Sequence, residues 1–85
     1  VGCGNGYCAS LICKEGPRSY KGIDIMSEQL DQACSLELGQ AEFIEASASD
    51  LSIFPDNSFD AVLDFCILHH VEGWRTFFDE AHRVL

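Results

Sequence analysis

The hydrophobic pattern near the beginning of the chain predicts a helix followed by a strand. Residues 7–15 carry apolar side chains at helical spacing, and the pair Gly16-Pro17 is well suited to end a helix. Residues 19–24 form a short run that is typical of an extended strand. A glycine-rich loop at residues 2–6 opens the first helix.

A second helix and a second strand follow in the same order. Ser27 is a good N-cap, and Gly39 is a residue type that commonly ends a helix. The apolar positions between them recur at helical spacing and are Leu30, Ala33, Cys34 and Leu38. Residues 42–46 are predicted to form the second strand, and residues 47–58 a loop.

The last third of the chain predicts a buried strand and an amphipathic helix. Residues 59–68 are the most apolar stretch, which is typical of a strand covered on both faces at the centre of a parallel sheet. The final helix carries one apolar stripe, formed by Trp74, Phe77, Phe78, Ala81 and Leu85. Its polar side carries Arg75, Asp79, Glu80 and Arg83.

The order of these elements predicts an α/β fold class. Alternation of helices and strands implies a parallel sheet with crossover helices, so we expect a Rossmann-like arrangement. We expect it to be truncated, because only Val1 stands where a first strand should precede the glycine loop and no strand follows the last helix. The 85 residues are therefore expected to form one partial domain.

Charge and composition narrow the classes of partner. The 5 Lys and Arg residues and 14 Asp and Glu residues give a formal net charge of −9. Neither nucleic acid nor an anionic membrane is expected as a partner, because both attract clustered basic residues. No stretch reaches the ~18 apolar residues of a membrane span.

The five cysteines are Cys3, Cys8, Cys13, Cys34 and Cys66. Their odd number and the lack of a Cys-x-x-Cys pair argue against a disulfide framework and against a zinc site. We expect small buried thiols in a reducing, cytoplasmic compartment. A second interpretation stays open for Cys3, which belongs to the glycine loop and could lie beside a ligand.

Three segments carry candidate chemistry. The glycine loop at residues 2–6 lets the backbone approach a ligand, although a simple tight turn is the alternative. Asp24 stands about 20 residues further on, where a carboxylate can accept hydrogen bonds from both hydroxyls of a ribose. A solvated aspartate at the end of a strand is the alternative for Asp24.

The adjacent imidazoles of His69 and His70 follow the most apolar stretch. Ligands of open parallel sheets bind at the carboxyl ends of the strands, and the glycine loop, Asp24 and this pair all fall at such ends. We therefore expect them to converge on one edge of the sheet. Structural histidines are the alternative, and a metal site is disfavoured because neighbours on an extended segment face opposite ways.

Four segments of the chain also form a recognisable set. They are Val1-Gly2-Cys3-Gly4-Asn5-Gly6, Gly22-Ile23-Asp24-Ile25 with Ser27, Phe54-Pro55-Asp56-Asn57-Ser58-Phe59-Asp60, and Leu68-His69-His70-Val71 with Glu80, Arg83, Val84 and Leu85. In this order and spacing they resemble the class I S-adenosylmethionine-dependent methyltransferases, and most closely their small-molecule-type methyltransferase domain. The resemblance implies an enzyme that transfers a methyl group directly from the cofactor's sulfonium to an acceptor, with no metal and no covalent nucleophile.

The resemblance further implies which residues bind the cofactor, S-adenosylmethionine. They are Gly2, Cys3, Gly4, Asn5, Gly6, Asp24, Ile25, Met26, Ser47, Ala48, Phe65 and Cys66. The glycines would surround the methionine part, Asp24 would bind the ribose hydroxyls, and the two residues after it would lie against the adenine. Phe65, Cys66 and Ile67 would lie near the sulfonium. His69 or His70 would face the substrate, and His70 is the candidate general base.

Two departures keep other functions open. The dinucleotide pattern Gly-x-Gly-x-x-Gly needs a glycine where this chain has Tyr7, which disfavours a nicotinamide-dependent oxidoreductase. The resembled family often has an acidic residue where this chain has Ser47 or Ala48, with Asp50 nearby, which favours a degenerate, non-catalytic relative. The sequence specifies neither the methyl acceptor nor the oligomeric state.

Overall fold

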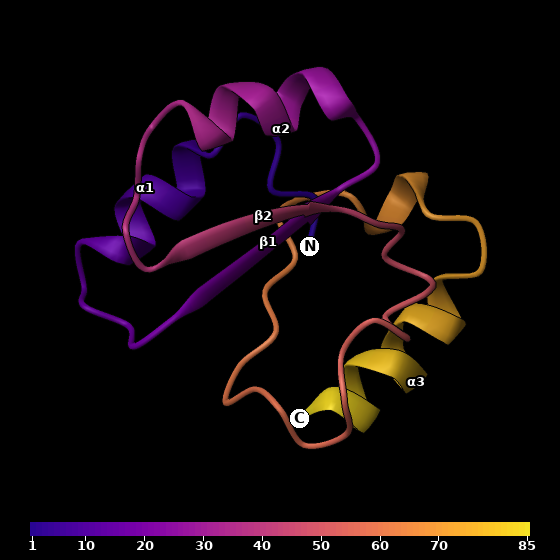
Figure 1. The fold of residues 1–85 in the computed structure, drawn as a ribbon. Helices are drawn as coiled ribbons and strands as arrows, with labels where there is room; N and C mark the ends of the chain where they lie inside the picture. The colour runs from indigo at the N-terminus through magenta and orange to yellow at the C-terminus, as the bar shows by residue number, and fades with distance from the viewer.

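The computed structural model describes residues 1–85 and shows helices alternating with strands (Figure 1). The elements are α1 (Tyr7–Cys13), β1 (Tyr20–Asp24), α2 (Ser27–Cys34), β2 (Ala41–Glu45), the 3-10 helix η1 (Leu68–His70) and α3 (Trp74–Val84). The predicted alternation is confirmed through β2, with boundaries that shift by one or two residues for α1 and for both strands. None of the helices is long and apolar enough to cross a membrane.

The two strands pair in parallel and are joined by α2 as a crossover helix. Tyr20 pairs with Ala41 at one end of the ladder, and Asp24 pairs with Glu45 at the other. Figure 1 shows α1 and α2 on one side of this pair and α3 on the other. Parallel pairing brings the carboxyl ends of β1 and β2 to the same edge, where Asp24 lies.

The core lies mainly between β1, the loop after β2 and α3. One cluster consists of Ile23, Leu51 and Val84, each no more than 2% exposed. A second cluster consists of Ala48, Phe77 and Ala81. Both clusters join the loop to α3, and burial of these side chains holds the C-terminal helix against the sheet.

The prediction of a buried strand at residues 59–68 is wrong for this structure. The sheet contains β1 and β2 alone, and the segment forms no ladder with either strand. The amino group of Val1 donates a hydrogen bond to the carbonyl of Leu63, but Val1 belongs to no strand. A strand needs a neighbour along its length, and a groove of about 690 Å³ separates this segment from β1.

The predicted apolar stripe of the last helix is partly wrong. Phe77 and Ala81 are buried as expected, and the third buried position is Val84. Trp74, Phe78 and Leu85 are about half exposed. The buried face of α3 is therefore narrower than the apolar stripe in its sequence. β1 and the loop after β2 cover only the side that carries Phe77, Ala81 and Val84.

The predicted limits of the second helix are also corrected. Met26, rather than Ser27, occupies the N-cap position, and its N–H donates to the Asp24 carboxylate at 3.0 Å. The helix ends at Cys34 instead of continuing toward Gly39. After the helix, turns closed by hydrogen bonds between residues three apart lead to Glu37, which has a left-handed φ of 53°. No side chain caps the helix N-terminus in the way expected of Ser27; the Asp24 carboxylate instead fixes the chain at Met26, just before the helix begins.

The five thiols are free, but not all are buried. Cys3 and Cys13 are buried, Cys8 is half-buried, and Cys34 and Cys66 are exposed. The expectation of five small core residues is therefore wrong for the last two. Cys34 lies at the end of α2, and Cys66 lies at a bend, where its own φ is left-handed at 61°.

Replacement of Gly6 by alanine is expected to destabilise the full-length protein by about 1–2 kcal/mol from its left-handed backbone alone. Gly6 has φ 87°, and a Cβ there would lie 2.8 Å from Leu36 Cδ1 and 3.1 Å from the Ala33 Cβ, which adds to the cost. Gly39 is the matched control, because it has no positive φ and an open environment. Thermal unfolding should show a clearly lower midpoint for Gly6→Ala than for the wild type and almost no change in midpoint for Gly39→Ala. Equal midpoints for the two variants would contradict the assigned geometry.

Candidate functional site

The glycine loop and the end of β1 are held together by hydrogen bonds. The Gly4 N–H donates to Asp24 Oδ2 at 2.9 Å. One residue earlier in each segment, the Cys3 N–H donates to the Ile23 carbonyl at 2.9 Å. The two segments, about 20 residues apart in sequence, therefore form one unit at the carboxyl edge of the sheet, as the sequence predicted.

The Asp24 carboxylate is oriented by two backbone groups. Oδ2 accepts from Gly4, and Oδ1 accepts from the Met26 N–H at 3.0 Å. A carboxylate offers about four acceptor positions, so two remain for further donors. The side chain is only half-buried and can therefore reach a ligand. This arrangement suits a pair of neighbouring hydroxyls.

The two residues after Asp24 are exposed at the end of β1, and Asn5 of the glycine loop is held at the start of α1. Ile25 is 70% exposed and Met26 is 52% exposed, so both offer apolar surface beyond the end of β1. Within the glycine loop, the Asn5 side chain accepts from the N–H of Tyr7, the first residue of α1, at 3.1 Å. The Asn5 side chain is thus occupied at the helix start, and its backbone remains the part available to a ligand.

The Cys3 side chain is buried beneath the loop. Burial raises the pKa of its thiol to about 11, and the nearby Asp24 carboxylate adds to the rise. At neutral pH the thiol is therefore protonated and unsuited to nucleophilic attack. Its side chain also lies 3.1 Å from where a Cβ on Gly22 would stand, so Cys3 packs against the strand.

The segment that carries Phe65, Cys66 and Ile67 reaches the glycine loop. A Cβ placed on Gly2 would lie 2.4 Å from Ile67 Cγ2, so the Ile67 side chain covers this glycine directly. Gly2 also has a left-handed φ of 66°. Phe65 is half-buried and Cys66 is exposed beside it. The third predicted segment therefore converges on the same loop, even though it is not a strand.

The two histidines lie in η1, just beyond this segment. Their rings are in contact and tilted by 45°, with centroids 3.8 Å apart, and both residues are exposed. The His70 N–H donates to the Ile67 carbonyl at 2.8 Å, which ties η1 to the residue that covers Gly2. No group of three or more His, Cys, Asp or Glu side chains is arranged to hold a metal ion.

The loop after β2 begins next to Asp24. The Ala46 N–H donates to the Asp24 backbone carbonyl at 3.0 Å. Ser47 is exposed, whereas the Ala48 side chain is buried against α3, so only the backbone of Ala48 is left for a ligand. Asp50 is exposed, and its carboxylate accepts from the Ser52 N–H at 3.1 Å. Hydrogen bonds from Ser52 lower the pKa of Asp50, so the carboxylate is charged at neutral pH.

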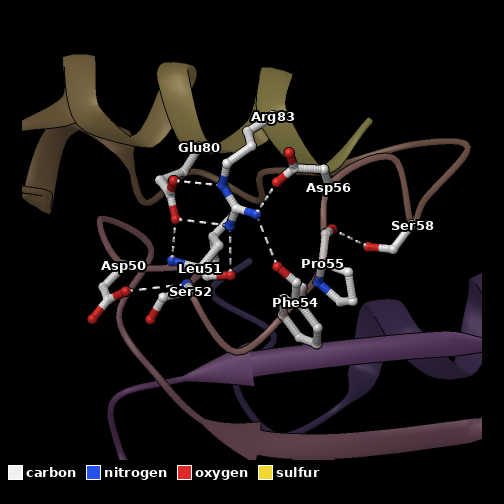
Figure 2. A network of polar contacts seen from close by, with 9 residues as sticks. All are labelled: Asp50, Leu51, Ser52, Phe54, Pro55, Asp56, Ser58, Glu80 and Arg83. Atoms are coloured by element: carbon white, nitrogen blue, oxygen red, sulfur yellow. Dashed lines mark hydrogen bonds and ion pairs between the residues drawn. The ribbon is translucent and has the colours of Figure 1, made fainter.

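A polar network fastens this loop to α3, as Figure 2 shows. Arg83 donates to Glu80, to Asp56 Oδ1 at 2.8 Å, and to the backbone carbonyls of Leu51 and Phe54, each at 2.9 Å. Glu80 in turn accepts from the Leu51 N–H at 2.8 Å. The sequence placed Glu80 and Arg83 on a solvated face, and only their three-residue spacing hinted at the pair.

Acid should weaken this network in a predictable direction. Hydrogen bonds from Arg83, chiefly, lower the pKa of Glu80. A carboxyl whose pKa is lower in the folded chain adds stability above its ordinary value of about 4.3, and this stability is lost as pH falls through the folded pKa. Unfolding of the full-length protein between about pH 5 and pH 3 should therefore depend less steeply on pH in Glu80→Gln. Identical slopes for both proteins would contradict the role of the ion pair.

The comparisons with known proteins bear on this arrangement of segments. A family model described as a methyltransferase domain matches residues 1–85. The chain belongs to this methyltransferase domain family. A fatty-acid O-methyltransferase of Mycolicibacterium smegmatis is 36% identical over all of this chain, which covers 31% of that protein. A sterol 24-C-methyltransferase, erg-4, of Neurospora crassa is 33% identical, with 24% of its length covered.

Solved structures place the fold in the same group. The YcgJ protein of Bacillus subtilis superimposes with a TM-score of 0.89 at 30% identity, over 99% of this chain and 37% of that one. The MccD protein gives a TM-score of 0.86 at 28% identity, over 99% of this chain and 39% of that one. The methyltransferase domain described here thus has the Rossmann-like α/β fold expected from its sequence, and it spans about a third of the proteins it matches.

Proposed function

We propose that the full-length protein binds S-adenosylmethionine at the carboxyl edge of β1 and transfers its methyl group to an acceptor. The observation that carries this proposal is the bond between the Gly4 N–H and the Asp24 carboxylate, which joins the two halves of the expected site. Membership of the methyltransferase domain family supports the choice of cofactor. The acceptor stays unassigned.

The residues at this edge fit the cofactor's ribose and methionine parts. Asp24 has acceptor positions free for two hydroxyls, and its two backbone contacts fix the direction in which they lie. Gly4 has open space where a Cβ would stand, with only Gln29 Oε1 within 4 Å, at 3.7 Å. The methionine part could therefore approach the Gly4 backbone without a side chain intervening.

Few catalytic groups are needed for this chemistry. The bound cofactor supplies a methyl group that is already activated by its positive sulfonium. The protein's task is to align the acceptor and to exclude water, which requires fixed geometry more than reactive side chains. The Ile67 side chain on Gly2 and the apolar surface of Ile25 and Met26 provide such an enclosure on two sides.

His70 is the residue we propose to face the acceptor. Its exposed ring lies in η1, which the backbone bond to Ile67 holds beside the glycine loop. An imidazole can take a proton near neutral pH, which is needed only for acceptors that must lose one. With such an acceptor, His70→Gln should slow methyl transfer and leave cofactor binding unchanged.

Titration calorimetry of the full-length protein tests the cofactor assignment. We expect S-adenosylmethionine and S-adenosylhomocysteine to bind and NAD not to bind, because Tyr7 replaces the third glycine of the dinucleotide pattern. Tighter binding of NAD would overturn the assignment in favour of an oxidoreductase. Binding of none of the three would favour a non-catalytic relative.

A further inference from the structure

The guanidinium of Arg83 forms hydrogen bonds to the loop that follows β2. Two of its hydrogen bonds go to backbone carbonyls of the loop, at Leu51 and Phe54, and a third goes to the Asp56 carboxylate. The loop has no regular secondary structure over residues 46–58, so its carbonyls depend on donors from elsewhere. Glu80 holds the guanidinium from the other side, with contacts of 2.9 and 3.1 Å (Figure 2).

The contacts of Leu51 connect this network to the candidate site. The Leu51 backbone is held at both ends, since its N–H donates to Glu80 and its carbonyl accepts from Arg83. Its side chain is 2% exposed and packs against Ile23, the residue before Asp24. At its start the loop is anchored to Asp24 by the Ala46 N–H. Residues 47–50 are thus held between Asp24 and the Arg83 network, with Ala48 packed against α3.

The direction of a bound cofactor follows from these positions. The glycine loop lies on one side of Asp24, and residues 46–50 lie on its other side, beyond the paired strand β2. A ligand whose ribose is held by Asp24 and whose methionine part lies on the glycine loop must extend its base toward residues 47–50. The shape of that stretch then decides how the base is contacted.

We propose that Glu80 and Arg83 are positioning residues that fix residues 47–50 and thereby set recognition of the adenine base. This inference rests on the proposed function, because it concerns the same cofactor site. Neither residue touches the cofactor. Their effect passes through the backbone of Leu51, and the two carbonyl contacts require the planar fork of an arginine. A lysine at position 83 offers one ammonium and cannot hold both carbonyls in the same geometry.

Binding of two probes to the full-length protein tests this proposal. The probes are S-adenosylhomocysteine and S-inosylhomocysteine, which differ at the 6-position and N1 of the base: adenine has an amino donor and an N1 acceptor, whereas hypoxanthine has a carbonyl acceptor and an N1–H donor. The variants are Arg83→Lys and the milder Glu80→Gln, and the matched control is Arg75→Lys on the same helix. The Arg75 guanidinium lies 4.9 Å from the Trp74 ring centroid and takes no part in the loop network. Calorimetry is performed at a temperature at which circular dichroism shows every protein folded.

Arg83→Lys and Glu80→Gln should weaken S-adenosylhomocysteine binding about fivefold, the effect of disturbing one hydrogen bond of ordinary strength. The preference for adenine over hypoxanthine should fall with it, whereas Arg75→Lys should match the wild type. A purely structural pair would lower the unfolding temperature and leave the preference unchanged, and that result would overturn the inference alone. If the wild type fails to bind S-adenosylhomocysteine, the proposed function falls and this inference falls with it.

Discussion

Asp24→Ala is expected to weaken binding of S-adenosylmethionine to the full-length protein at least tenfold. Each hydrogen bond to a charged group contributes about 1.5–3 kcal/mol, and about 1.4 kcal/mol corresponds to a factor of ten in affinity. Alanine also leaves the N–H groups of Gly4 and Met26 without their acceptor, so the glycine loop loses its tie to β1. Both consequences act in the same direction.

Two further variants separate these consequences. Asp24→Asn keeps one oxygen acceptor for a backbone N–H but removes the charge, so it should fall between the wild type and Asp24→Ala. Asp31→Ala removes an exposed carboxylate from α2 and should leave affinity unchanged. Equal affinities for the wild type and Asp24→Ala, measured by calorimetry, would mean that Asp24 is only a solvated aspartate at the end of a strand.

The second large effect concerns residues 1–85 taken alone, which we expect neither to unfold cooperatively nor to transfer methyl groups. Only 13 of the 85 residues are buried, and the sheet has two strands. Two-stranded sheets are only marginally stable in water, and the free energy of unfolding of native domains is only about 5–15 kcal/mol. The segment at residues 59–67 also faces a groove of about 690 Å³ with its backbone groups unpaired by β1.

The full-length protein supplies the comparison. We expect it to show a single thermal transition that S-adenosylmethionine raises, because a ligand that binds only the folded state stabilises it. Residues 1–85 should show a shallow transition that the cofactor does not move, together with aggregation through exposed strand edges. A sharp transition and turnover from residues 1–85 alone would contradict this account of where the stability resides.

The sequence predicted the convergence at the carboxyl edge because local signals carry it. Gly2 and Gly6 have left-handed backbones that favour glycine, and Asp24 ends β1, which is separated from the glycine loop by the short helix α1. These features depend on residues that are near one another in the chain, with one helix between them. The ribose-binding role of Asp24 remains a prediction, supported by its two backbone contacts.

The errors arose where long-range packing decides the outcome. Residues 59–68 are apolar enough for a buried strand, but a strand also needs a neighbour, and β1 does not reach it. Trp74 and Phe78 continue the apolar stripe of α3, yet both stay about half exposed because neither joins a core cluster. Arg83 donates hydrogen bonds to the backbone carbonyls of Leu51 and Phe54, and a hydrophobic pattern does not predict bonds to backbone groups.

The structure of the full-length protein bound to S-adenosylhomocysteine tests the central claim most directly. We expect both ribose hydroxyls within about 2.5–3.0 Å of the Asp24 carboxylate, with the amino-acid part of the ligand on the Gly2–Gly6 loop. The base should then lie over Ile25 and Met26, beside residues 47–50. A ligand bound elsewhere, with the Asp24 carboxylate making no contact to the ribose, would contradict it.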